Sequence, residues 1–154
     1  MRRGAVLINN YEQLKRWNFI WPSRGDGPWE LTVHGIDKAL GKNQSAIGVY
    51  WIGYSSCGNH ATFQAKYCGK AVRQPLYGRL NQHVRKSSNE MIRKHLASRH
   101  KGLPKLWFRF VELPSLQLAE LLEGLEIAAF RKDFWNKRDE WTQHWAMEED
   151  YPHR

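Results

Sequence analysis

Ala46-Ile47-Gly48-Val49-Tyr50-Trp51-Ile52-Gly53 is a run of β-branched and aromatic residues, the composition expected of a β-strand. A cluster of turn-forming residues follows at 55–59, where the chain reads Ser-Ser-Cys-Gly-Asn. Residues 62–69, Thr-Phe-Gln-Ala-Lys-Tyr-Cys-Gly, then alternate loosely between apolar and polar side chains. The three segments together predict a β-hairpin.

Signals for helices and a further strand continue downstream of the hairpin. Apolar residues recur four positions apart from Leu76 onward, and Ser87 with Glu90 matches a capping box. An aromatic and β-branched run comes next, and then a leucine-rich amphipathic stretch with Ser115 as its N-cap. The expected elements are a helix over 76–84, a helix from Ser88 to about Arg99, a strand over 106–111 and a helix over 116–130.

These elements predict an α+β fold with a small three-stranded, mostly antiparallel sheet flanked by helices. The 154 residues suit a single domain. We divide it into an N-terminal extension at 1–45, a core at 46–136 and a helical C-terminal tail at 137–154. The extension is irregular in pattern, with a short helix expected at 11–17 and a helical turn at 36–40.

Positive charge is concentrated in the middle of the chain. The whole sequence has a formal net charge of +9, but residues 51–111 alone hold 12 Lys and Arg against Glu90 as their one acid. Residues 112–154 are net acidic, with 10 Asp and Glu against 5 Lys and Arg. So one-sided a basic block indicates a polyanionic partner.

Composition excludes several other classes. No stretch approaches the ~20 apolar residues of a membrane span, so no membrane partner is expected. The first ten residues contain too short an apolar run for a secretory signal, and two cysteines make no disulfide framework. A reducing, cytoplasmic setting is therefore expected. The sequence also lacks a Walker-type phosphate loop and a Gly-x-Ser-x-Gly elbow.

Two short motifs lie on the two strands of the predicted hairpin. Gly48-Val49-Tyr50 and Tyr67-Cys68-Gly69-Lys70 resemble the paired motif of the GIY-YIG nuclease family. Arg79 and His83, with three residues between them, resemble the Arg and His that this family carries at that spacing on its first helix. Glu123, in the leucine-rich helix, and Asn136, shortly after it, resemble the family's catalytic Glu and following Asn. The resemblance covers residues 46–136.

The resemblance implies a metal-dependent DNA endonuclease that hydrolyses a phosphodiester bond, with Mg²⁺ or Mn²⁺ bound by Glu123. It implies that Tyr50 acts as base or positions the water, with Tyr67 in support. Two assignments stay open, because Arg73 is an alternative to Arg79, and Glu120 and Glu126 lie on the same predicted helix as Glu123.

The residue types fit that chemistry on physical grounds. Arg79 and His83 are four apart and share one helix face. An arginine can hold a phosphate through two hydrogen bonds and neutralise a transition state, while a histidine can orient water or move a proton. Lys70 can help to hold the phosphate, and Glu123 close to an apolar face favours a cation partner. Asn136 is expected to brace the site through amide hydrogen bonds.

Further contacts to double-stranded DNA are expected from the basic residues and from the N-terminal 45 residues. One site per chain favours a homodimer or two sequential nicks. A restriction- or phage-type enzyme would fit, as would a structure-selective repair nuclease; the alternative is a nucleic-acid-binding protein that does not cleave. The basic residues expected to bind nucleic acid are Arg73, Arg85, Lys86, Arg93, Lys94 and Arg99.

A zinc-stapled interaction module is a third hypothesis. Cys57 and His60 are spaced closely enough to share a zinc ion, and Cys68 follows on the next strand. A fourth ligand would have to be His83, His95 or His100. No second close pair of ligands lies at a fitting interval, so the sequence favours the nuclease reading.

Overall fold

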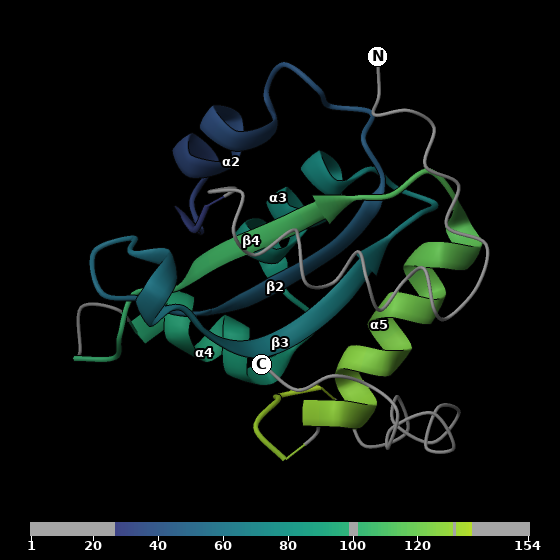
Figure 1. Cartoon of the computed structure of the whole chain (residues 1–154). Coiled ribbons are helices and arrows are strands. Elements are labelled where there is room, and N and C mark those ends of the chain that lie inside the picture. Colours follow the sequence, from purple (N-terminus) through teal and green to yellow (C-terminus); the bar gives the residue numbers. More distant parts are fainter. Residues whose placement is uncertain (1–26, 99–101, 131, 137–154) are drawn as a thin grey trace.

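A computed structural model describes residues 27–98, 102–130 and 132–136. In this part of the chain the fold is α+β, as predicted, with four helices and one sheet (Figure 1). A short 3₁₀ turn at His60–Thr62 lies in the hairpin loop. In chain order the elements are β1 (Trp29–Glu30), α2 (Val33–Leu40), β2 (Gly48–Tyr54), β3 (Gln64–Ala71), α3 (Leu76–Lys86), α4 (Glu90–Ser98), β4 (Trp107–Glu112) and α5 (Leu116–Phe130).

The predicted hairpin forms one half of the sheet, with β2 in the interior and β3 at the edge. Strands β2 and β3 pair antiparallel, with Tyr50 opposite Gly69 and Trp51 opposite Cys68. The register shifts between Ile52 and Gly53, which indicates a β-bulge. Strand β4 pairs antiparallel with the other side of β2, so β3 is an edge strand.

The prediction of three strands is wrong, because the described residues form a four-stranded sheet in the order β1-β4-β2-β3. Strand β1 has only two residues, Trp29 and Glu30, which pair with Phe108 and Trp107 of β4. So short a strand has no alternating pattern for a sequence to reveal. Its position is defined by β4, which follows it by more than 70 residues.

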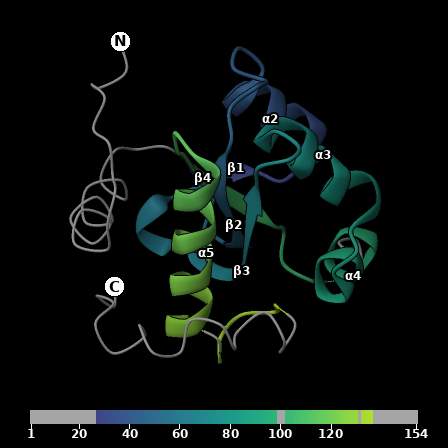
Figure 2. The same ribbon diagram turned by 90° about the vertical axis from the view of Figure 1, so that its right-hand side faces the viewer.

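The sheet separates two apolar cores (Figure 2). Val49, Trp51 and Cys68 face α5, whereas Tyr50 and Ile52 face the side covered by α2, α3 and α4. Successive side chains of a strand point to opposite faces, so each strand of the hairpin contributes to both cores. The same alternation assigns the chemically active side chains of these strands to one face or the other.

Helix boundaries follow local capping, and three differ from prediction: α2 begins at Val33 instead of residue 36, α3 ends at Lys86 instead of residue 84, and α4 begins later than expected. Helix α5 spans 116–130 as predicted, and the Leu118 amide donates to Oγ of Ser115. The predicted capping box at Ser87 and Glu90 is wrong, because Asn89 caps α4 instead. Its Oδ1 accepts from two amides of the first turn, and α4 therefore begins at Glu90 rather than Ser88. The expected helix at 11–17 and the C-terminal tail lie outside the described residues.

Residues 132–136 close the exposed edge of β3. Asn136 is buried, and its side chain pairs with the backbone of Cys68. Oδ1 accepts from the Cys68 amide at 3.0 Å, and Nδ2 donates to the Cys68 carbonyl at 2.7 Å. The Trp135 amide donates to the Lys66 carbonyl on the same strand. One side chain therefore replaces the partner strand that an edge lacks.

We expect Asn136→Ala to lower the free energy of unfolding by about 2–4 kcal/mol, because it leaves a buried amide and a buried carbonyl of Cys68 without their partners. Urea unfolding at pH 7 measures the change. Asn43→Ala is the matched control, since Asn43 also bonds through its side-chain amide but at an exposed position, and a change under about 0.5 kcal/mol is expected there. Equal effects of the two substitutions would contradict this role for Asn136.

Candidate active site

Two short hydrogen bonds join strand β2 to the end of helix α3. The Tyr50 hydroxyl lies 2.7 Å from Nε2 of His83, and Nδ1 of His83 lies 2.7 Å from Oγ of Ser87. All three side chains are buried. His83 and Ser87 are four residues apart, so the helix aligns them while the strand supplies the tyrosine.

Tyr50 has no exposed surface, and the next strand leaves room for it. Gly69 lies opposite Tyr50 in the β2–β3 pair. A Cβ atom at position 69 would collide with the Tyr50 hydroxyl. Steric contact with Tyr50 of the first motif therefore explains why the second motif has a glycine at position 69.

Arg79 lies beside this buried group, on the same helix as His83. Its guanidinium interacts with the hydroxyls of both Tyr50 and Tyr67. Nη1 also donates to Gln82 Oε1 at 3.0 Å. The rings of Tyr50 and Tyr67 each meet the His83 ring edge-on, so the site is a compact cluster of three aromatic rings whose tyrosine hydroxyls interact with Arg79.

Burial sets the protonation states of the cluster. Burial, and then the neighbouring Tyr67, raise the pKa of Tyr50 well above its ordinary value, although Arg79 opposes this shift. Burial, and then the charge of Arg79, lower the pKa of His83 to about 4. At neutral pH Tyr50 keeps its proton and His83 is uncharged. Because Arg79 can only donate, Tyr50 donates to Nε2 of His83, whose Nδ1–H donates to Ser87.

The low pKa of His83 predicts a loss of stability in mild acid. Folded His83 titrates near pH 4, whereas an unfolded histidine titrates near 6.5, so protons bind the unfolded chain first as the pH falls. The contribution of uncharged His83 to the free energy of unfolding is complete above pH 6.5 and is lost as the pH falls toward 4. Between pH 7 and 4.5 this group costs about 2–3 kcal/mol of unfolding free energy.

Urea unfolding at several pH values measures this loss, with His83→Gln as the matched variant without an imidazole. Other groups titrate in both proteins, so the difference between the two pH profiles isolates His83. If the free energy of unfolding changes with pH in the same way in both proteins, the folded protein does not depress the pKa of this histidine.

Lys70 and Glu123 meet on the other face of β3. Lys70 follows Cys68 by two positions and so faces α5, where its Nζ lies 3.7 Å from Oε1 of Glu123. The Glu123 side chain is 18% exposed, which leaves the carboxylate accessible. Glu126 is fully buried and accepts a 2.7 Å hydrogen bond from Trp51 Nε1, so it does not face a substrate. Glu120 is exposed, and Glu120 and Glu123 remain the alternatives.

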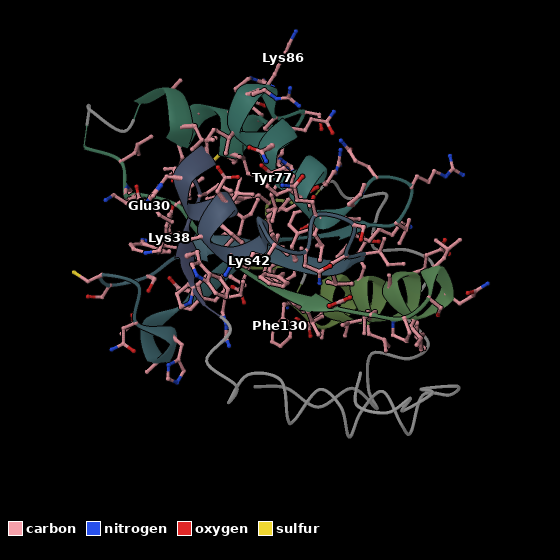
Figure 3. All side chains as sticks on the ribbon, turned by 90° about the horizontal axis from the view of Figure 1, so that it is seen from above. Glu30, Lys38, Lys42, Tyr77, Lys86 and Phe130 are labelled. Atoms are coloured by element: carbon pink, nitrogen blue, oxygen red, sulfur yellow. The ribbon has the colours of Figure 1, made fainter. Side chains whose placement is uncertain are left out.

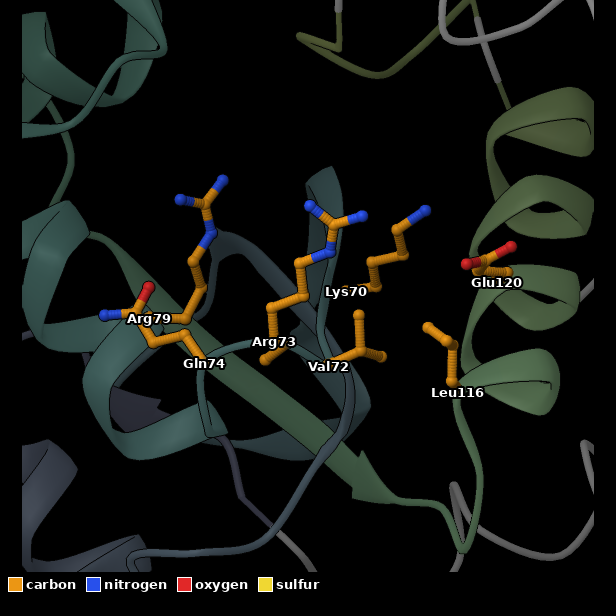
Figure 4. A pocket seen from close by; sticks show the side chains of 8 residues that line it. Lys70, Val72, Arg73, Gln74, Arg79, Leu116 and Glu120 are labelled. Atoms are coloured by element: carbon orange, nitrogen blue, oxygen red, sulfur yellow. The ribbon is translucent and has the colours of Figure 1, made fainter.

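A pocket of about 320 Å³ lies between α3 and α5, beyond the end of β3 (Figure 4). Lys70, Arg73 and Arg79 extend their charged ends to the same side of it, and Glu120 faces them from α5. Leu116, one of the two large apolar side chains exposed in the described residues, forms part of its wall. The pocket brings together cations that lie up to nine positions apart in the sequence, and arginine and lysine side chains suit the binding of a phosphate.

The site has one carboxylate that suits the coordination of a magnesium ion. Mg²⁺ is commonly bound through one or two carboxylates, waters and substrate phosphates, and Glu123 supplies one accessible carboxylate close to the pocket cation Lys70. Within the described ranges, no three His, Cys, Asp or Glu side chains gather as a ligand set. The zinc hypothesis loses support for the same reason, since Cys57 is exposed while Cys68 is buried among apolar residues.

The remaining predicted contact residues are spread over α3 and α4. Arg85, Lys86 and Lys94 are exposed, and Lys86 projects far from the ribbon (Figure 3). Arg93 is exposed and donates to the Ser87 carbonyl at 3.1 Å. Arg99 lies outside the described residues. The sequence interpretation missed Ser87 as a partner of His83, because its spacing from Glu90 matched a helix cap.

No family model, curated protein or solved structure matched this chain. None of the helices in the described part of the chain combines the length and the apolar character needed to cross a bilayer. The fold and the geometry of the pocket are therefore the basis for assigning a function.

Proposed function

We propose that this chain is a metal-dependent DNA endonuclease of the GIY-YIG type. The single observation that carries the proposal is the position of Arg79, whose guanidinium lines an open pocket and interacts with the tyrosines of both motifs. Residues from β2, β3 and α3 therefore meet at one point, as the resemblance requires. A restriction- or phage-type enzyme fits the small size of the chain.

Arg79 and Lys70 hold the phosphate in this scheme. Arg79 is half-buried, so its charge is less screened than that of a surface arginine, and its Nη1 donates a hydrogen bond to Gln82. Arg73 adds a third, exposed cation at the same pocket. Charge that develops on the phosphoryl oxygens in the transition state is stabilised by these preorganised donors.

Tyr50 and His83 handle the proton of the attacking water. Neutral His83 already accepts a hydrogen bond from Tyr50 at Nε2. When the Tyr50 oxygen takes a proton from the attacking water, Tyr50 can therefore pass its own hydroxyl proton to Nε2. The imidazolium that results would keep its Nδ1 hydrogen bond to Ser87. Tyr50 is enclosed, so the water must approach it past Arg79 or Tyr67.

Glu123 is the proposed ligand of Mg²⁺ or Mn²⁺, with Glu120 as the alternative. A bound divalent ion would supply Lewis-acid stabilisation of the phosphate and its leaving group. Glu123 would hold such an ion beside the pocket residue Lys70, and Lys70 would then release the carboxylate and turn to the phosphate. The weak 3.7 Å ion pair allows that exchange.

A plasmid-nicking assay with Mg²⁺ tests the proposal. The wild-type protein should convert supercoiled DNA into nicked or linear DNA, and EDTA should abolish the conversion. Sequencing of the ends from a mixed DNA pool would then identify a recognition sequence or structure, including the branched substrates of a repair nuclease. Binding without any Mg²⁺- or Mn²⁺-dependent cleavage across these pools would overturn the proposal.

The second candidate is a nucleic-acid-binding protein that keeps this fold without cleaving. Two observations favour it: Tyr50 has no exposed surface, and Glu123 is paired with Lys70. Both features are compatible with a resting enzyme, but they would persist in a protein without activity. Unchanged binding of DNA by Glu123→Gln, with no cleavage by the wild type, is the result expected for this candidate.

A further inference from the structure

A second pocket lies between α3 and α4, on the far side of His83 from Tyr50. It has a volume of about 220 Å³, and His83 and Ser87 contribute to its lining. Both residues are buried, so they form its floor rather than its rim. The pocket therefore adjoins the hydrogen-bonded chain that begins at Tyr50.

Three cations surround this pocket. Arg85 and Lys86 come from the last turn of α3, and Arg93 comes from α4. No acidic residue contributes to the lining. Among the described residues none of these cations forms an ion pair with a carboxylate, in contrast to Lys70 with Glu123.

Three like charges around one pocket without a counter-charge oppose folding, because they repel one another. An anion bound among them removes that cost. Arginine guanidinium groups suit a phosphate in particular, since their planar donors match its oxygens. Arg93 is also oriented by its hydrogen bond to the Ser87 carbonyl, so one donor of the set is already fixed.

We infer that the α3–α4 pocket is a second phosphate subsite, which binds a backbone phosphate of the nucleic acid a few nucleotides away from the phosphate at Arg79. The inference rests on the proposed function for the identity of the polyanion. Arg79 and Arg85 are six residues apart on α3, which corresponds to about 9 Å along the helix axis. The two subsites therefore lie close enough along α3 to contact phosphates of one bound nucleic acid.

The first test measures binding of a short DNA duplex in EDTA at several salt concentrations. Arg85→Ala combined with Arg93→Ala should weaken binding about tenfold and reduce the slope of log Kd against log salt by about 1. Lys105→Ala combined with Lys132→Ala is the charge-matched control, because both lysines are exposed and neither lines this pocket. An unchanged slope in the Arg85/Arg93 variant would overturn the subsite.

The second test locates the bound anion by methyl NMR with inorganic phosphate as the probe. Leu96 lines the α3–α4 pocket, and Leu116 lines the pocket at Arg79. Phosphate should shift the Leu96 methyl resonances in the wild type but not in the Arg85/Arg93 variant. Leu116 should respond in both proteins, which also shows that the variant is folded. Leu96 resonances that do not move in the wild type would refute the inference.

Neither test depends on cleavage. A wild-type protein that binds DNA with the expected salt slope but never nicks it would overturn the proposed nuclease and leave the subsite standing. If instead the wild type nicks DNA but the Arg85/Arg93 variant shows no change in salt slope, the subsite is overturned and the proposed nuclease stands.

Discussion

Replacing Arg79 with alanine is expected to lower the rate constant of Mg²⁺-dependent nicking by about 10²–10³-fold, the usual effect of removing one preorganised donor to a developing oxyanion. The reason lies in its position: it is the cation that both lines the open pocket and interacts with Tyr50 and Tyr67. Single-turnover nicking at saturating protein separates this effect on the chemical step from weaker binding.

Two companion variants sharpen the experiment. Arg79→Lys keeps the charge but loses the paired donors, so it should recover only part of the rate. Lys105→Ala removes an exposed charge that does not line the pocket and should leave the rate within about twofold of wild type. A full rate in Arg79→Ala, together with a loss in Arg73→Ala, would reassign the phosphate contact to Arg73, which lines the same pocket.

Glu123→Gln is expected to reduce nicking by about 10³-fold, because it removes the carboxylate charge that holds the divalent ion while preserving the size of the side chain. Metal-assisted stabilisation is worth several kcal/mol, and each 1.4 kcal/mol corresponds to a factor of ten in rate. The stability of the protein should change little, since the pair with Lys70 is long and partly exposed. Measuring the rate against Mg²⁺ concentration should show a weaker apparent affinity for the metal.

Glu120→Gln is the matched control on the same helix. Glu120 is exposed and lines the pocket, whereas Glu123 contacts Lys70. The opposite pattern, a large loss in Glu120→Gln and none in Glu123→Gln, would assign the metal to Glu120. Glu126 is unsuitable for such a test, because its buried hydrogen bond to Trp51 makes any substitution structural.

Local sequence signals predicted much of the fold because they act over a few residues. Helix α5 begins and ends where its leucine pattern and the Ser115 cap indicated. The hairpin formed where β-branched and aromatic residues flank a turn cluster. Capping was less predictable at α4, because Ser87, Ser88 and Asn89 are adjacent candidates and only contacts across the fold select among them. In the structure the Ser87 hydroxyl is hydrogen-bonded to His83, and Asn89 is the N-cap of α4.

The spacing of the motifs also predicted which types of residue would lie close together, but it did not predict which side chains would contact one another. Nothing in the sequence distinguishes Glu123 from Glu126, which lie three residues apart on one helix. In the structure, α5 turns one toward Lys70 and buries the other against Trp51. A rotation of about 300° over three helical residues separates an accessible carboxylate from one enclosed in the core.

The sequence by itself determined the α+β class, the β2–β3 hairpin, the helix at 116–130 and the concentration of positive charge in residues 51–111, because each depends on neighbouring residues or on composition. Only the tertiary structure decided the pairing of β1 with β4, the contact between Tyr50 and His83, and the closure of the β3 edge by Asn136. Each of these joins residues at least 33 positions apart, and such contacts form only when whole elements pack together.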